Sequence, residues 1–481
     1  MGANILTSPS NGAEAPMPAL REARSAIRPG RRALLISYHF PPVGGAGVQR
    51  PVKFAKYLRR FGWEVSVLVA ENPSVPVTDT SLVADIPRDT IVWRAKSWEP
   101  GYKLKQGFAS PEGQERRRRS LTAAVVKRTL QLLRSGAGTF LQPDPQVLWL
   151  PSALRAGIRL LELLHHDAIV ATAPAYTNLL LGAMLKGRFG LPLLLDFRDE
   201  WDISTAYLEN SPNSRITHAV QSRMQNHVLR QADAIVATTE ASARRLKERA
   251  RAAGGQAAAY CIYNGFDPDD FASMFDPTKL MAPRDDAFHL VYTGTLWNLT
   301  SVEPLVRAVE LINARSPELL TRLCLTFVGR TLPAQQDILA RLRRTRCTLR
   351  LEDYCDHMQS LAWMGSADAL CLLLSDLPEA DRVVPAKLFE YMATRKEILA
   401  IVPDGEAADI LRRLGMGSRF RPDNSEGVAR WLQDRIMGVR PPAPAGGTII
   451  EQFTRERLCG QMARLLDDLV LCEGQVLPRT S

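Results

Sequence analysis

Short apolar runs alternate with segments of helical periodicity along the chain from about residue 31. Apolar runs of about four to eight residues that lack alternating polar positions are typical of parallel strands covered on both faces. In the first half of the chain these runs occupy residues 33–38, 65–70, 168–172, 191–195 and 234–238. In the second half they occupy residues 290–293, 323–328, 348–351, 369–374 and 398–402. The pattern predicts two consecutive open α/β sheets.

Helical segments separate the predicted strands. A helix that begins near residue 48 carries apolar residues on one face, and Gly62 ends it as a C-terminal glycine cap does. Further helices are predicted at residues 217–231, 301–313, 332–343, 358–364, 386–393 and 453–470. Strands and helices in this order indicate doubly wound, Rossmann-like sheets.

The same pattern suggests where the domains begin and end. Residues 1–30 contain no apolar segment of signal-peptide type and are expected to be a loose leader. A first Rossmann-like domain is predicted over residues 31–264, with an insertion at about 71–150 where the periodicity weakens. A second is predicted over residues 265–450, and residues 451–481 carry a final helix that crosses back to the first domain. Because ligands of such sheets collect at the carboxyl ends of strands, we expect the two domains to face each other across an interdomain cleft.

Composition narrows the class of protein. The chain has 481 residues, 46% hydrophobic, and Lys+Arg exceed Asp+Glu by 61 to 51, which gives a net charge of +10. This excess favours anionic ligands or acidic lipid surfaces, although solubility alone also explains it. The basic residues are dispersed and no recognition motif is present, so no nucleic-acid partner is expected. The seven cysteines lack the spacing of a zinc site, and most lie in apolar runs, as buried thiols do in a reducing compartment such as the cytoplasm.

A glycine-rich turn follows the first predicted strand. His39 precedes it, and Gly44, Gly45 and Gly47 lead into the helix. Backbone N–H groups and the positive helix end would allow an anion or a sugar to approach closely there. The dinucleotide-binding fingerprint requires a third glycine where this chain has Arg50, so that function is a minor option. A tight turn without a ligand is the structural alternative.

Charged residues gather after the predicted strand at residues 191–195. The segment 196–202 contains four acidic residues, an arginine and a tryptophan. Such a loop can be merely solvated, but its place at a strand's carboxyl end favours a polar pocket. We expect Arg198 and Asp199 to face the cleft.

The strongest local feature is the segment 382–393. Pro385 suits the first turn of a helix, so the N–H groups after it are expected to be unpaired at the positive end of the helix dipole. Arg382 and Lys387 add positive charge, and together these groups can hold a diphosphate without a metal. Glu390 can accept hydrogen bonds from a ribose, or it can form an ion pair within the helix with Lys387.

Five motifs, in this order along the chain, resemble those of family 4 glycosyltransferases. They occupy residues 36–47, 196–199, 263–267, 292–295 and 385–391. The resemblance extends over roughly residues 31–470 and implies a GT-B fold, a retaining transfer, no metal, and a nucleotide-sugar donor bound mainly by the second domain. None of these motifs identifies the sugar.

The resemblance assigns roles to individual residues. Glu390 matches the second glutamate of the family's E-x7-E motif, which holds the donor ribose, but Arg382 stands where the first glutamate belongs. Glu379 and Asp381 lie close enough in sequence to substitute for it. Residues matched to the donor site as a whole are Thr293, Gly294, Thr295, Arg330, Tyr354, Pro385, Arg382, Lys387 and Glu390. Here Thr295 and the stretch after it replace a cationic pair of the family.

These assignments lead to a functional expectation. Lys387, Arg382 and Asp199 are the candidate catalytic residues, and the glycine-rich turn with His39, Arg198 and Asp199 is the candidate acceptor side. We expect a glycosyltransferase of bacterial cell-surface polysaccharide or glycolipid assembly, with a saccharide or lipid-linked acceptor. Basic residues at 116–134 suggest peripheral contact with the inner face of a membrane. A sugar-nucleotide 2-epimerase and a catalytically inactive nucleotide-sugar-binding protein are the alternatives.

Overall fold

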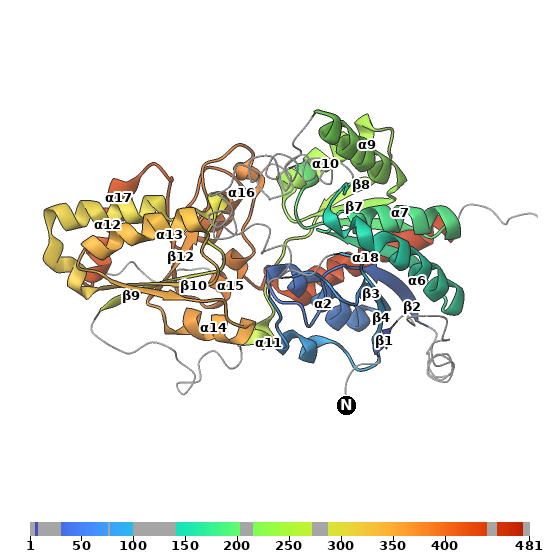
Figure 1. Ribbon diagram of the computed structural model, residues 1–481, viewed down its shortest axis with the longest axis horizontal. Coiled ribbons are helices and arrows are strands. Elements are labelled where there is room, and N and C mark those ends of the chain that lie inside the picture. The colour runs from blue at the N-terminus through green and yellow to red at the C-terminus, as the bar shows by residue number, and fades with distance from the viewer. Residues whose placement is uncertain are drawn as a thin grey trace, which may run out of the picture. The chain divides into compact units, whose positions relative to one another are not determined.

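The computed structural model describes residues 5–7, 30–75, 77–99, 141–202, 215–271, 287–439 and 450–474 (Figure 1). The chain forms two compact units. Unit 1 contains the residues up to Thr238, Ser242–Ile262 and the residues from Cys459 onward. Unit 2 contains Thr239–Ala241 and Tyr263–Leu458.

Unit 1 is built on one parallel sheet of eight strands. The strand order is β1-β4-β3-β2-β5-β6-β7-β8. Apart from the edge strand β1, the chain builds outward from β2 through β3 to β4, and then returns to build the other side from β5 to β8. This is the doubly wound arrangement that the sequence predicts. The strands are β1 (Ile5–Thr7), β2 (Arg31–Ile36), β3 (Trp63–Ala70), β4 (Ile91–Ala95), β5 (Ala168–Ala173), β6 (Leu193–Phe197), β7 (Ala234–Ala237) and β8 (Ala258–Cys261).

The five predicted strands of unit 1 are present, and three others were missed. β4 lies inside the expected insertion, which was therefore drawn too widely, and β1 lies inside the expected leader. β1 and β8 are the two edges of the sheet, and residues of β8 are alternately exposed and half-buried. Edge strands need fewer apolar residues than central ones, so they give a weaker signal. The basic segment 116–134 lies outside the described residues.

Helices cover the sheet of unit 1 because each carries an apolar face. Buried side chains of β2 to β7 pack against α6, α7, α9 and α10 in one hydrophobic cluster. The predicted glycine cap is confirmed, since Gly62 ends the first helical segment at φ +82°. The described helices are α2 (Ala46–Tyr57), α6 (Leu150–Leu163), α7 (Thr177–Phe189), α9 (Arg215–Gln231), α10 (Glu240–Ala252) and α18 (Arg455–Gly474).

Unit 2 is built on a parallel sheet of six strands in the order β11-β10-β9-β12-β13-β14. All five predicted strands are confirmed, and the short edge strand β14 was missed. The strands are β9 (Phe288–Thr293), β10 (Leu323–Val328), β11 (Thr348–Glu352), β12 (Ala369–Leu373), β13 (Glu397–Ile401) and β14 (Ser418–Phe420).

Both faces of this second sheet are buried. Leu370 and Leu372 of β12 belong to one hydrophobic cluster with α14, α15 and α16, whereas Ala369, Cys371 and Leu373 belong to another with α12, α13 and α17. This alternation explains why the strand has no polar positions. The helices are α11 (Pro268–Phe271), α12 (Glu303–Arg315), α13 (Pro333–Ala340), α14 (His357–Ser366), α15 (Lys387–Ala393), α16 (Glu406–Leu414) and α17 (Ser425–Ile436).

The described helices give no candidate for a membrane span, because none combines the required length with sufficient apolar character.

Candidate functional site

A sharp turn follows β9 at the centre of the unit 2 sheet. Gly294 has φ +119° and donates its N–H to Val328 O at 2.7 Å. The next turn along the sheet contains Gly329 at φ +125°, where a Cβ would lie 2.6 Å from Gly294 O. Both positions therefore require glycine, and the two backbones are in contact. Thr293 is buried in this turn, and its N–H donates to the hydroxyl of Tyr391 at 3.0 Å.

The side chain of Lys387 reaches this turn from α15. Its Nζ donates to the Tyr292 hydroxyl at 2.7 Å and lies 3.9 Å from the centre of the same ring. A Cβ on Gly294 would lie only 2.5 Å from Nζ. The Tyr292 hydroxyl in turn donates to Thr295 O at 2.9 Å. The fold thus brings a cation to the turn whose own sequence lacks one.

Burial lowers the pKa of Lys387 from 10.5 to about 7. The negative charge of Glu390, one helical turn further along α15, acts in the opposite direction and favours the protonated amine. A Tyr hydroxyl and a ring face stabilise an ammonium less than a carboxylate does. An anionic ligand at this position would supply the missing negative charge.

The start of α15 differs from the prediction. The helix begins at Lys387, with Ala386 as its N-cap, so Pro385 lies before the helix and not in its first turn. The Leu388 N–H donates to Pro385 O at 2.9 Å and the Phe389 N–H donates to Ala386 O at 3.2 Å. These two N–H groups are therefore occupied, which corrects the expectation for Leu388 and Phe389 alone. The positive charge of the site comes from the Lys387 side chain instead.

Glu390 lies on α15 with its side chain 15% exposed. The Nδ1 atom of His357 is 3.9 Å from Glu390 Oε1, and the Nε2 atom is 3.3 Å from Asp270 Oδ2. Sequence reasoning missed both His357 and Asp270, because they come from α14 and α11 and no motif connects them.

Arg382 pairs with Glu379, a residue that the sequence analysis considered as a substitute for the missing first glutamate. Its Nη2 donates to Glu379 Oε2 at 3.1 Å, and its backbone carbonyl accepts from Thr239 Oγ1 at 3.0 Å. Glu379 has φ +64°, so the turn that carries both side chains is strained. Asp381 is exposed, and the backbone of its turn packs against Gly405, where a Cβ would lie 2.4 Å from Asp381 O.

Two other predicted donor residues lie on the surface of unit 2. Arg330 is exposed, and its carbonyl accepts from the Leu296 N–H at 2.8 Å. Tyr354 follows β11 and is 37% exposed. Their contact with a donor remains a prediction.

In unit 1 the glycine-rich turn is covered by Arg198. Gly45 has φ +99° and caps α2, and the guanidinium of Arg198 donates to Gly47 O. A Cβ on Gly47 would lie 2.9 Å from Arg198 Nη1, so a larger residue there would displace the guanidinium. Gly44 donates its N–H to Val77 O at 3.0 Å, while the ring of His39 packs edge-on against Tyr38. The glycine-rich turn and Arg198 are therefore in direct contact.

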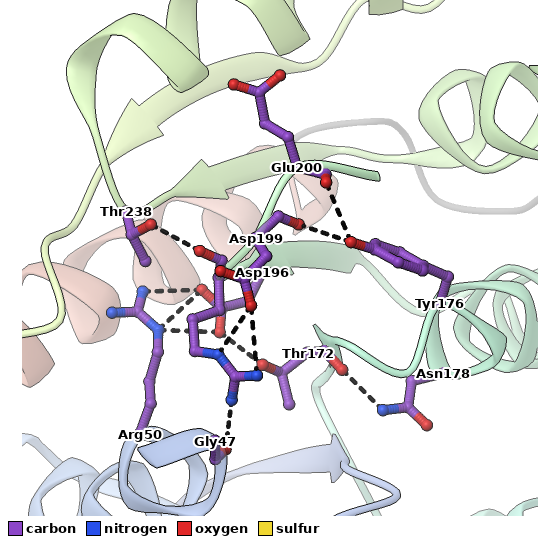
Figure 2. A network of polar contacts seen from close by, with 10 residues as sticks. Gly47, Arg50, Thr172, Tyr176, Asn178, Asp196, Asp199, Glu200 and Thr238 are labelled. Carbon is purple, nitrogen blue, oxygen red and sulfur yellow. Dashed lines mark hydrogen bonds and ion pairs between the residues drawn. The ribbon is translucent and has the colours of Figure 1, made fainter. Parts of the chain in front are cut away.

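The charged segment after β6 is mainly internal, since Asp196, Glu200 and Trp201 are all buried. Asp196 is fully buried and accepts hydrogen bonds from Arg50 Nη2 at 2.8 Å, from Arg50 Nε at 3.0 Å and from Thr172 Oγ1 at 2.8 Å (Figure 2). Arg50, the residue that stands where a dinucleotide fingerprint has glycine, thus has a structural partner. Sequence reasoning did not pair these two residues, which are 146 positions apart.

The remaining acidic residues of this segment also have partners. Glu200 is buried and accepts from Ser242 Oγ at 2.5 Å, and Asp202 pairs with Arg249. Asp199 is different, because its side chain is 53% exposed. Of the acidic residues expected to line a pocket, Asp199 is therefore the one with a largely exposed carboxylate. It lies beside Arg198, whose Nε is 3.4 Å from Asp199 Oδ2.

Comparison with protein families identifies the first unit. Residues 44–258 match the model of the glycosyl transferase 4-like domain. This segment is a glycosyl transferase 4-like domain. The match includes the glycine-rich turn, the Arg50–Asp196 pair and the segment with Arg198 and Asp199, so these features belong to the transferase domain. No curated protein matches the chain.

Solved structures share the fold over both units. HepE from Anabaena, crystallised with UDP and glucose, is 17% identical, with a TM-score of 0.58 over 91% of this chain and 100% of that one. The α,α-trehalose 6-phosphate synthase from Burkholderia multivorans is 14% identical, with a TM-score of 0.59 over 92% and 100%. The lipopolysaccharide outer core galactosyltransferase WaaB is 13% identical, with a TM-score of 0.51 over 92% and 99%. The transferase domain is thus part of a GT-B fold that includes unit 2.

Proposed function

We propose that this chain transfers a sugar from a nucleotide-sugar donor to an acceptor hydroxyl, and that unit 2 binds the donor. The observation that carries the proposal is the position of Lys387, whose ammonium lies at the Gly294 turn at the carboxyl end of the central strand β9. In open α/β sheets this edge is where ligands bind. A pyrophosphate there would meet the lysine, and a ribose would meet Glu390, one helical turn away.

The chemical step follows from the charge that develops. Breaking the bond between sugar and nucleotide leaves negative charge on the diphosphate, and Lys387 would stabilise this charge by donating a hydrogen bond. The acceptor hydroxyl would attack from the face that the diphosphate leaves and would give its proton to the departing phosphate oxygen, so that the sugar keeps its anomeric configuration. The transferase domain in unit 1 supports this reaction class. No metal is part of the proposal.

The acceptor is assigned to unit 1. Asp199 offers an exposed carboxylate and Arg198 a guanidinium that already covers the glycine-rich turn. A saccharide or a lipid-linked saccharide provides the hydroxyl and polar groups for which these side chains are suited. We further propose a cytoplasmic enzyme of cell-surface polysaccharide or glycolipid assembly, with peripheral membrane contact.

Donor binding can be tested with matched lysine variants. UDP-glucose is the first donor to try, because HepE was crystallised with UDP and glucose, and GDP- and ADP-sugars follow. A ligand that binds only the folded state raises the melting temperature of the native protein. Lys387→Ala is expected to lose this shift and about a hundredfold in transfer rate, the scale of a lost transition-state donor.

Lys396→Ala is the control, since Lys396 is also a lysine of unit 2 whose pKa is lowered by burial, and its side chain donates to Ala367 O at 2.5 Å. We expect this variant to keep the ligand-induced shift. Equal loss in both variants, or unchanged transfer by Lys387→Ala, would remove Lys387 from the mechanism. Nuclear magnetic resonance of the first-formed product tests the stereochemistry, and an inverted anomeric centre would exclude the retaining step.

A further inference from the structure

Three side chains from separate segments of unit 2 meet beside the candidate donor site. His357 Nε2 lies 3.3 Å from Asp270 Oδ2, and His357 Nδ1 lies 3.9 Å from Glu390 Oε1. The side chains of His357, Asp270 and Glu390 are only 9%, 13% and 15% exposed. Solvent therefore screens their mutual interaction weakly. The imidazole stands between two carboxylates of which only one belongs to α15.

The backbone around His357 and Asp270 is itself fixed. His357 is the first residue of α14, and the preceding Asp356 caps this helix by accepting from the Gln359 N–H at 2.8 Å. Asp270 belongs to the single turn α11, where its own N–H donates to Asp267 O at 3.1 Å. The imidazole is therefore held at a defined place next to Glu390.

We propose that His357 is a positioning residue for Glu390, in which Asp270 orients the imidazole and the imidazole holds the carboxylate toward the donor ribose. This inference rests on the proposed function, because it assigns a donor contact to Glu390. A glutamate has three side-chain torsions, and a carboxylate that is already fixed loses less freedom when a ligand binds. An orienting partner of this kind changes affinity without touching the ligand.

A double-mutant cycle tests the proposal. The dissociation constants of UDP, GDP and ADP are measured by isothermal titration calorimetry on the full chain and on His357→Ala, Glu390→Gln and the double variant. We expect His357→Ala to weaken binding about fivefold in the native background, the scale of coupling between neighbouring residues. In the Glu390→Gln background we expect no further weakening. Native affinity in His357→Ala, or the same loss in both backgrounds, would refute positioning through Glu390.

Two further variants serve as controls for the loss of any histidine and for an unstable His357→Ala protein. His165 also lies 3.2 Å from a carboxylate, that of Asp167, but it is 87% exposed and belongs to unit 1, so His165→Ala should bind like the native protein. His357→Gln places an amide near the former Nε2 and removes the group near Glu390. It should therefore weaken binding as His357→Ala does, and native affinity would overturn the proposal even if His357→Ala is unstable.

Binding by the native protein distinguishes an error in the donor site from an error in the role of His357. If it binds none of the three nucleoside diphosphates, the donor site is wrong and the role of His357 fails with it. If it binds one of them and the His357 variants bind equally well, only the role of His357 is refuted.

Discussion

The buried Arg50 and the half-buried Lys387 are stabilised in different ways. Arg50 makes several hydrogen bonds to the buried carboxylate of Asp196, so its charge is matched within unit 1. Lys387 contacts a neutral hydroxyl and an aromatic ring, and Glu390 acts on it only from a distance. A matched pair leaves little charge for a ligand, whereas the weakly matched Lys387 suits the anion that the proposed donor would bring.

The lowered pKa of Lys387 predicts a pH dependence of donor binding. The folded-state pKa near 7 lies below the ordinary value of 10.5, and a bound pyrophosphate favours the protonated amine. Affinity for UDP-glucose should therefore fall as pH rises above about 7, by up to about tenfold per pH unit. Titration calorimetry between about pH 6 and about pH 9 measures this, because the pyrophosphate diester does not titrate in this range.

Lys387→Met is the control for this prediction, and its affinity should not vary with pH. In the unliganded native protein the sign is opposite. Between about 7 and 10.5 the unfolded chain binds a proton at Lys387 that the folded chain lacks, so the contribution of this residue to stability increases with pH in that interval. A pH-independent affinity of the native protein would contradict the role of the lysine.

At the scale of elements, the turn after β9 is the part that makes the candidate donor site possible. Gly294 combines a positive φ with contact to the lysine amine, and Gly329 packs on its carbonyl. Most residue types can follow a strand, but here a side chain at Gly294 would meet the Lys387 amine, and one at Gly329 would meet the backbone of Gly294. The position of the Lys387 amine therefore depends on the backbone conformation of this turn.

Gly294→Ala tests this coupling. The substitution should destabilise the protein by about 1 to 3 kcal/mol through backbone strain, and it should also displace the Lys387 amine. Gly187→Ala is the matched control, because Gly187 lies in α7 with no heavy atom within 4 Å of its potential Cβ. Alanine should stabilise that helix by about 1 kcal/mol. Chemical denaturation and UDP-glucose binding measure both effects, and native binding by Gly294→Ala would separate the turn from the site.

The elements also show how far periodicity could predict the fold. Central strands such as β10 and β12 are apolar on both faces and were found with nearly correct bounds. The edge strands β1, β8 and β14 were missed, since half their residues or more face outward or the strand is short. The start of α15 was placed too early, because Pro385 suits a helical first turn but here precedes it.

At the scale of the whole molecule, each unit has its own sheet and its own hydrophobic clusters. Chains with separate cores commonly do not unfold in a single two-state transition. The proposal places the donor in unit 2, whereas the Arg50–Asp196 pair lies in unit 1. Changes in the two units should thus affect different parts of the unfolding profile.

Differential scanning calorimetry is expected to show two transitions. Asp196→Ala leaves the buried Arg50 guanidinium without its carboxylate, which should cost about 3 to 5 kcal/mol and lower only the unit 1 transition. UDP-glucose should raise only the unit 2 transition. Asp89→Ala, which breaks an exposed pair with Arg59, is the control and should shift neither by a measurable amount. A single transition that responds to both changes would show that the units unfold together.

The sequence by itself determined the class of fold, since apolar periodicity depends only on which faces of each element are buried. It also determined the residue types of the candidate site, namely the glycine turns, Lys387 and Glu390. Only the tertiary structure decided which groups meet. It placed the Lys387 amine at Gly294, paired Arg50 with Asp196, and set His357 between two carboxylates. Contacts between residues far apart in the chain depend on how the strands are ordered and on how side chains pack, and neither is visible in local periodicity.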